Sequence, residues 1–202
     1  MNNEVLYADA IEFADQFELS ELFRFKTILI TGSTGLIGSV MIRCLLALNH
    51  RKNIGCKIVA IVRNLAKARQ MFEDVFDEII FYQIDLQDLN KAVFEQKIDY
   101  VVHLANPTAS SFFVQYPVET INTILSGTSA VLEFVRNNAV SAMVYASSIE
   151  VYGSNDTDEW INEEFQGYVN PVDVRSSYSL GKRAAECLCH SFSEEFIPAP
   201  KV

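Results

Sequence analysis

Thr27-Ile28-Leu29-Ile30-Thr31-Gly32-Ser33-Thr34-Gly35-Leu36-Ile37-Gly38 is the stretch that decides the fold of this chain. A run of apolar, β-branched residues leads through a turn of glycine, serine and threonine into an apolar-periodic segment at 37–49. This order predicts a strand, a tight turn and a helix. Gly32 and Gly35 would let the backbone approach a pyrophosphate, and Gly38 would let the helix pack closely on the strand. Because two residues separate Gly32 from Gly35, the spacing is not G-x-G-x-x-G, and a purely structural turn stays open.

The rest of the chain alternates between strand and helix patterns. Strands are predicted at 27–31, 57–63, 78–84, 100–105 and 142–147, and helices at 37–49, 65–76, 89–96, 118–138 and 177–196. Such alternation implies a doubly wound parallel sheet with helices on both faces, so the predicted class is α/β of the Rossmann type. Residues 1–25 precede this pattern. They carry Ile11, Phe13, Phe17 and Leu22 roughly at helical spacing, which predicts an amphipathic helical extension.

Composition and charge limit the classes of protein that the chain can represent. Its 202 residues are half hydrophobic and 21% charged, which suits one domain with a substantial core. The net charge of −10 argues against a nucleic-acid partner, which would require a basic stripe. The apolar runs are too short for a membrane span, and no signal-sequence pattern opens the chain. The four cysteines and three histidines lack ligand spacing, so we predict no metal site and a cytoplasmic protein.

A second motif, Tyr178-Ser179-Leu180-Gly181-Lys182, places a phenol and an ammonium four residues apart in a predicted helix. At that spacing both side chains lie on one face of the helix. A cation that close favours the phenolate form of a tyrosine. A phenolate can take a proton from an alcohol while a cofactor takes the hydride. Taken alone, however, such a pair more often consists of a buried ring and a solvated charge.

A third motif follows the predicted strand at 142–147, where two serines and Glu150 succeed an apolar run. In an open α/β sheet, ligands bind outside the carboxyl ends of the strands. Ser148 and Glu150 are therefore candidates to contact a reacting hydroxyl group, although polar residues at a strand end are common.

In this order, the three motifs resemble those of the extended short-chain dehydrogenase/reductase family, the NAD-dependent nucleotide-sugar epimerases, dehydratases and decarboxylases. The resemblance runs from about Lys26 to Val202, so residues 26–202 are expected to form an NAD(P)-binding Rossmann domain. The segment 169–186, with Arg175-Ser176-Ser177-Tyr178 and Gly181-Lys182-Arg183, is most similar to the UDP-glucuronate decarboxylase branch.

The resemblance implies a site for NAD and a nucleotide-diphosphate sugar. The implied catalytic residues are Ser148, Glu150, Tyr178 and Lys182. The implied cofactor contacts are Gly32, Gly35, Leu36, Ile37, Gly38, Arg63, Asn64, Asp85, Leu86, Leu104, Ala105, Asn106 and Thr108, together with Tyr178 and Lys182.

The implied mechanism is a transient oxidation at sugar C4. Tyr178 would take the proton of the 4-hydroxyl while hydride leaves C4, Lys182 would hold the nicotinamide ribose, and Ser148 would bridge the hydroxyl and the phenol. The 4-keto sugar could then epimerise, lose water, or lose carbon dioxide if C5 bears a carboxylate. Glu150 could assist this step by acid–base chemistry, and return of the hydride would regenerate the cofactor.

Three positions depart from the family pattern. Arg63 ends the second predicted strand where NAD-preferring relatives carry an acid, and an arginine there can neutralise the 2′-phosphate of NADP. Ile149 replaces the aspartate of the 4,6-dehydratases, which weakens that reaction. Ile124 replaces an asparagine that precedes the family's Gly-Thr, here Gly127-Thr128, so one cofactor contact is in doubt.

The end of the chain bears on how much of the parent enzyme is present. Residues 197–202 resemble the approach to the family's sixth strand, so we expect truncation there, without the smaller C-terminal substrate domain. The full-length enzyme is expected to be a homodimer. The alternative is a non-catalytic Rossmann domain that senses a dinucleotide or uses residues 1–25 for assembly. A sensor would have no need for Tyr178 and Lys182 together with Ser148.

Overall fold

A five-stranded parallel sheet forms the centre of the protein. The computed structural model describes residues 3–156 and 158–196. The strands are β1 (Thr27–Thr31), β2 (Lys57–Val62), β3 (Ile80–Gln83), β4 (Tyr100–His103) and β5 (Ala142–Tyr145), in the order β3-β2-β1-β4-β5. Because the order reverses at β1, the crevice between the ends of β1 and β4 is the place where such sheets bind ligands. The predicted doubly wound Rossmann fold is confirmed.

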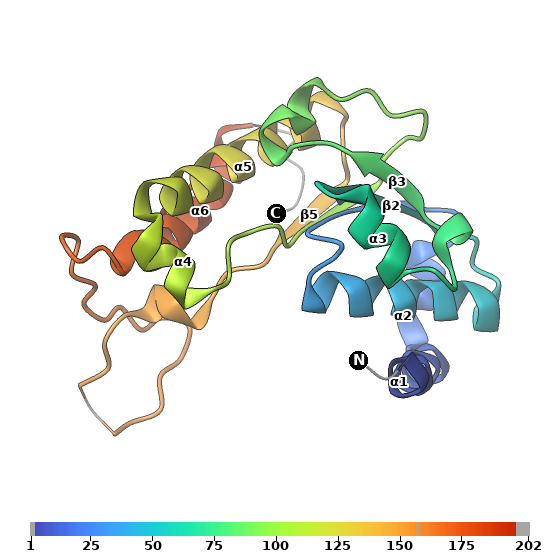
Figure 1. The fold of residues 1–202 in the computed structure, drawn as a ribbon, viewed down its shortest axis with the longest axis horizontal. Coiled ribbons are helices and arrows are strands. Elements are labelled where there is room, and N and C mark those ends of the chain that lie inside the picture. The colour runs from blue at the N-terminus through green and yellow to red at the C-terminus, as the bar shows by residue number, and fades with distance from the viewer. Residues whose placement is uncertain (1–2, 157, 197–202) are drawn as a thin grey trace.

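Helices cover both faces of the sheet (Figure 1). One face carries α2 (Leu36–Lys52) and α3 (Leu65–Met71), and the other carries α5 (Pro117–Asn137) and α6 (Ser176–Glu195). The remaining helices are α1 (Asn3–Gln16), α4 (Ser110–Gln115) and the 3-10 turns η1 (Glu18–Phe23), η2 (Phe76–Glu78), η3 (Leu86–Lys91) and η4 (Ile149–Tyr152). No helix in the described part of the chain combines the length and apolarity needed to cross a membrane.

The core has two layers because successive residues of a strand point to opposite faces of the sheet. Ile28 and Ile30 of β1 pack into the layer beneath α2, whereas Leu29 packs into the layer beneath α5. All five residues of β1 are buried, as expected for a central parallel strand.

Several elements differ from the prediction at their ends. The last four strands are one to three residues shorter than predicted, which leaves the residues after each strand free to line the sheet edge. The helix predicted at 89–96 is instead η3, which begins earlier because the Asp85 carboxylate caps it by accepting a hydrogen bond from the Gln87 amide. The short elements α4 and η4 were not predicted, since six and four residues are too few to show a periodicity.

The N-terminal extension packs on its own domain. Helix α1 lies against α2, where Ala10 and Ala14 are buried and allow the two helices to approach closely. Phe17 then packs on Phe23, whose ring meets Tyr100 at the start of β4 edge to face. At the other terminus, the predicted approach to a sixth strand lies outside the described residues.

Candidate active site

The glycine turn after β1 sits at the switch point of the sheet. Gly32 has φ +70°, and a Cβ atom there would lie 2.8 Å from Ala105 N and from Leu104 C. A Cβ on Gly38 would lie 2.5 Å from the Gly32 carbonyl oxygen. Only glycine permits either approach, so the turn, the end of β4 and the start of α2 converge.

The start of α2 is open to an anion. Gly35 is the N-cap residue and supplies no side-chain cap, and the first turn carries no acidic residue. Leu36 and Ile37 of this turn are 67% and 65% exposed. Free amides at the start of a long helix attract negative charge, and exposed apolar side chains beside them can cover a ligand.

A buried hydrogen-bond network fixes the ends of β1 and β4. The Thr31 hydroxyl oxygen accepts hydrogen bonds from the amides of Leu104 and Ala105, both at 3.2 Å. Its proton is then available for Nδ1 of His103, 2.8 Å away, which makes Nδ1 the acceptor and Nε2 the donor toward Thr128 at 3.4 Å. Burial, with Lys182 nearby, lowers the pKa of His103 to about 3, so the imidazole is neutral.

The segment after β4 presents one unsatisfied polar group. Both amide atoms of Asn106 are buried, and neither has a hydrogen-bond partner within the described residues. Leu104 and Ala105 are half-buried beside it, and Thr108 is exposed. A buried amide without a partner is rare and costly, which suggests that a ligand completes its hydrogen bonds.

Lys182 lies at the carboxyl end of β5. Its side chain is 2% exposed, and Nζ donates a 2.7 Å hydrogen bond to the Ala146 carbonyl oxygen. The ammonium lies 4.6 Å from the ring centre of Tyr145 and 5.9 Å from that of Tyr178. Burial lowers the pKa of Lys182 to about 8 and raises that of Tyr145.

Tyr178 is 7% exposed and lies one helical turn before Lys182. Its ring stacks on Phe113 of α4, with ring centres 4.1 Å apart and planes within 6°. Ile124 of α5 belongs to the same cluster and is fully buried, close to Gly181. The isoleucine thus packs α5 against α6, which explains how an apolar residue fits where an asparagine was expected.

Ser148 and Glu150 lie at η4, against the start of α6. Ser148 caps η4 by accepting a 3.2 Å hydrogen bond from the Glu150 amide, which leaves its own proton free to donate. Within the described residues, no hydrogen bond joins Ser148 to Tyr178. Both carboxylate oxygens of Glu150 accept from the Arg175 guanidinium, at 2.7 and 2.8 Å, and one also accepts from Ser179 at 3.0 Å.

The ion pair with Arg175 affects the protonation of Glu150. Hydrogen bonds from Arg175, and then from Ser179, lower the pKa of the Glu150 carboxyl. A carboxylate that is held ionised and bidentate is a poor proton donor, so this geometry weighs against the acid–base role expected for Glu150.

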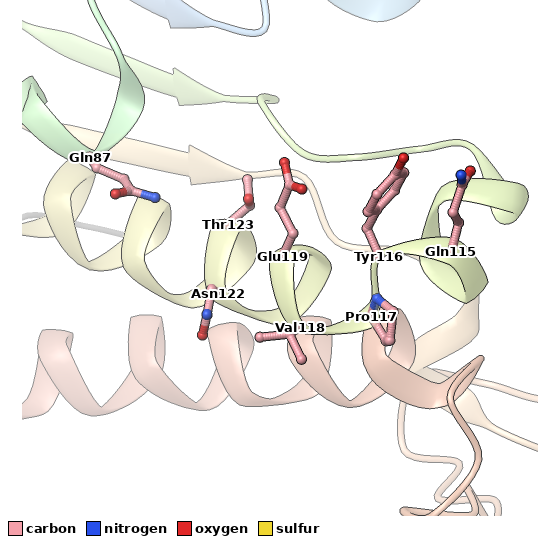
Figure 2. A pocket seen from close by; sticks show the side chains of 8 residues that line it. All are labelled: Gln87, Gln115, Tyr116, Pro117, Val118, Glu119, Asn122 and Thr123. Atoms are coloured by element: carbon pink, nitrogen blue, oxygen red, sulfur yellow. The ribbon is translucent and has the colours of Figure 1, made fainter.

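The cofactor contacts expected at Arg63, Asn64, Asp85 and Leu86 lie at the ends of β2 and β3. Arg63 is exposed, whereas the Asn64 side chain is engaged as the N-cap of α3, accepting from the Lys67 amide. Asp85 caps η3, and Leu86 packs against Gly127 of α5. Next to them lies a pocket of about 590 Å³, whose lining residues are Gln87, Gln115, Tyr116, Pro117, Val118, Glu119, Asn122 and Thr123. In Figure 2, Tyr116, Glu119 and Thr123 project to the same side of the α4–α5 segment.

Comparison with known proteins identifies the family in which this arrangement of residues occurs. Residues 28–199 match the NAD dependent epimerase/dehydratase family. The chain belongs to the NAD-dependent epimerase/dehydratase family. The match begins in β1 and runs through the glycine turn, Ser148, Tyr178 and Lys182, so the motifs described above all lie within it.

Several members of the family are similar in sequence. The chain is 29% identical over 177 residues to UDP-glucuronic acid decarboxylase 1 of Danio rerio, covering 88% of this chain and 40% of the relative. It is 30% identical to UDP-arabinose 4-epimerase 1 of Arabidopsis thaliana, covering 83% and 39%. It is also 30% identical to UDP-glucose 4-epimerase of Neisseria meningitidis serogroup B, covering 80% and 46%. The chain thus spans less than half the length of each of these relatives.

Solved structures of epimerases share the fold. The UDP-Glc/GlcNAc 4-epimerase of Campylobacter jejuni superposes with a TM-score of 0.72 at 22% identity, covering 86% of this chain and 51% of that one. The Thermus thermophilus UDP-glucose 4-epimerase in complex with NAD gives 0.70 at 24% identity, covering 84% and 51%. At these identities the likeness concerns the fold.

The site of this family member includes residues that the sequence did not single out as functional. They are Thr31, Phe113, Tyr145 and Arg175. Arg175 offered a signal, because it lies three residues before Tyr178 in the quoted motif. Phe113 offered none, since it lies 65 positions from Tyr178 in an apolar segment and meets it only through the fold.

Proposed function

We propose that this chain is the dinucleotide-binding part of an enzyme that converts a nucleotide-diphosphate sugar through transient oxidation at sugar C4. The observation that carries the proposal is Lys182, a buried ammonium bonded to Ala146 and held 5.9 Å from the Tyr178 ring. A purely structural lysine gains little from such burial, because desolvating an ammonium is costly. The family's epimerases, dehydratases and decarboxylases supply the reaction class.

The residues at the switch point fit NAD. Gly32 lets the turn lie directly against the backbone of Leu104 and Ala105, where a Cβ atom would clash, and the start of α2 offers uncapped amides for a pyrophosphate. The unpartnered amide of Asn106 lies at the neighbouring strand end, where it could bond the nicotinamide side of the molecule. We place NAD first because solved structures of similar epimerases hold NAD, and the exposed Arg63 at the end of β2 keeps NADP open.

The chain's own groups account for the proton transfer. When bound, a nicotinamide ring would accept the hydride of sugar C4 and later return it. Tyr178, as phenolate, takes the proton of the 4-hydroxyl, and the neighbouring Lys182 ammonium stabilises that anion. Ser148 keeps a free proton with which to bridge the substrate hydroxyl and the phenol. The product of this first half is a 4-keto sugar.

The later step distinguishes the reaction types. We favour a decarboxylase of the UDP-glucuronate type, because the segment 169–186 is most similar to that branch and a decarboxylase is among the relatives. The pairing of Glu150 with Arg175 supports a positioning role for Glu150. We further propose residues 1–25 as an extension of a domain at 26–202, a cytoplasmic location, and a homodimer for the full-length enzyme.

Binding and turnover test the proposal. Calorimetry should show that the chain binds NAD. Because the chain spans less than half the length of its relatives, turnover is tested in the full-length enzyme, which should convert UDP-glucuronate or UDP-glucose, followed by NMR. Tyr178→Phe should abolish conversion and leave the NAD dissociation constant within about twofold, because the phenol acts on the substrate. Failure to bind either dinucleotide, or full turnover by Tyr178→Phe, would refute the mechanism.

A further inference from the structure

A closed ring of contacts surrounds Tyr178 and includes groups that the proposed chemistry does not use. The Tyr178 ring stacks on Phe113, and the Arg175 guanidinium carbon lies 4.9 Å from the centre of the same Phe113 ring. Arg175 binds Glu150 through two hydrogen bonds of 2.7 and 2.8 Å. Glu150 in turn accepts a hydrogen bond from Ser179, the residue that follows Tyr178. The ring of contacts therefore returns to its starting point on α6.

We infer that Phe113 and Arg175 are positioning residues for the Tyr178 phenol, and that Glu150 holds Arg175 in place. The inference rests on the proposed function, because it assigns these residues a role in the same reaction. None of the three needs to touch the substrate. Their effect is to fix the direction of the phenol.

Phe113 restricts the Tyr178 ring directly. It is 1% exposed, and a parallel neighbour 4.1 Å away hinders rotation of the tyrosine ring about its own axis. Phe113 is held in turn, because the Ser177 hydroxyl donates a 3.3 Å hydrogen bond to its carbonyl oxygen. Thus α4, which follows the β4 segment containing Asn106, is anchored to the first turn of α6.

Arg175 suits this role better than lysine would. Its planar fork matches both oxygens of a carboxylate, and a guanidinium also lies favourably over an aromatic ring. Arg175 and Glu150 keep 37% and 30% of their side chains exposed, so their pairing adds little to the stability of the fold. The pair instead fixes the positions of η4, α4 and α6 relative to one another. Catalysis is sensitive to such geometry, because a displacement of about 1 Å can cost about a hundredfold in rate.

The kinetic experiments use the full-length enzyme, and the first of them removes the stack. Phe113→Leu should lower kcat about tenfold or more and leave KM and the NAD dissociation constant within about twofold, because the phenol is misdirected after binding. Phe72→Leu is the matched control, since Phe72 is equally buried but lies in the cluster beneath α2. It should lose stability and keep kcat. A kcat for Phe113→Leu equal to that of the control would overturn the inference.

The second experiment removes the guanidinium. Arg175→Gln should lower kcat by about tenfold, and Arg175→Lys should recover only part of it because an ammonium cannot form the bidentate bond. Arg69→Gln is the control, because the Arg69 guanidinium lies 4.2 Å from the ring centre of Phe76 on the other side of the sheet. Full kcat in Arg175→Gln would contradict the role assigned to Arg175.

A spectroscopic readout separates this inference from the proposed function. In wild-type chain, NMR should show slow flipping of the Tyr178 ring, and Phe113→Leu should speed it at least about tenfold. If the full-length wild type converts no nucleotide sugar but the flip rate changes as expected, the proposed function fails and the positioning contact stands. An unchanged flip rate would overturn the positioning role whatever the activity.

Discussion

Lys182 of α6 donates a 2.7 Å hydrogen bond to the carbonyl oxygen of Ala146, the residue directly after β5. This one bond ties the helix that carries the Tyr-Lys motif to the strand end that leads to Ser148. The ammonium also lies over the Tyr145 ring, so a carbonyl dipole and an aromatic face offset part of the cost of burying the charge.

The burial of Lys182 predicts a pH-dependent cost in stability. Its pKa falls from 10.5 to about 8, so at neutral pH the folded protein holds a charge that the unfolded chain solvates better. Between about pH 8 and pH 10.5 the unfolded state binds more protons, and this cost, about 3 kcal/mol, disappears as pH rises. Lys182→Met should lack that pH dependence and be at least as stable as wild type near pH 7, while losing turnover.

Denaturation with urea at about pH 7 and about pH 10 measures the Lys182 effect. The difference between wild type and Lys182→Met isolates the lysine, because the other titrating groups are common to both. A difference that stays constant across this range would show that the ammonium is not destabilised by burial.

Because of the backbone conformation at Gly32, a substitution there should lower both the stability of the fold and the affinity for NAD. Gly32→Ala introduces a Cβ at φ +70° and 2.8 Å from Ala105 N, so it should cost about 1–3 kcal/mol of stability and weaken NAD binding at least about tenfold. Gly55→Ala is the control, since Gly55 has φ +64° but faces only the Phe25 ring. It should lose stability with unchanged NAD affinity, as measured by thermal unfolding and calorimetry.

The position of Arg63 leads to a prediction about whether the protein prefers NAD or NADP. If its guanidinium binds a 2′-phosphate, Arg63→Asp should weaken NADP relative to NAD by about tenfold or more, since a charge-assisted hydrogen bond contributes roughly 1.5–3 kcal/mol. Lys67→Asp, also exposed and in the first turn of α3, makes the same charge change four residues beyond Arg63. Equal affinities of wild type for NAD and NADP would leave Arg63 without this role.

The contact of α1 with α2 predicts which part of the extension matters for stability. Ala14→Asp places a carboxylate at a fully buried position and should cost about 3 kcal/mol or more, because the charge has no solvent there. Ala8→Asp, exposed on the same helix, should change stability by less than about 0.5 kcal/mol. Chemical denaturation gives both values. A change of oligomeric state in Ala14→Asp with unchanged stability would favour the assembly role instead.

The sequence by itself determined the central strand, the glycine turn and the strand-end residues of this protein. The run at 27–31 predicted β1 with its observed bounds, because a strand buried on both faces is built mainly from apolar and β-branched residues, and here three apolar residues stand between two threonines. The glycine turn and the spacing of Tyr178 and Lys182 could also be recognised in the sequence, because each depends on a backbone conformation or a helical repeat within a few residues. Arg63, Asn64 and Asp85 were placed at strand ends by the same local logic, although only the structure showed that Asn64 and Asp85 serve as helix caps.

Only the tertiary structure decided how these parts meet. Phe113 reaches Tyr178 across 65 positions, Thr31 reaches His103 across 72, and Arg175 pairs with Glu150 across 25. No periodicity records such contacts, because they arise where the parallel strands end and neighbouring segments fold over one edge of the sheet. The ionisation of Lys182 and Glu150 follows from the same packing. Burial lowers the pKa of Lys182, and the adjacent Arg175 guanidinium lowers the pKa of Glu150. Neither effect can be read from the sequence, because both depend on neighbours that only the fold brings together.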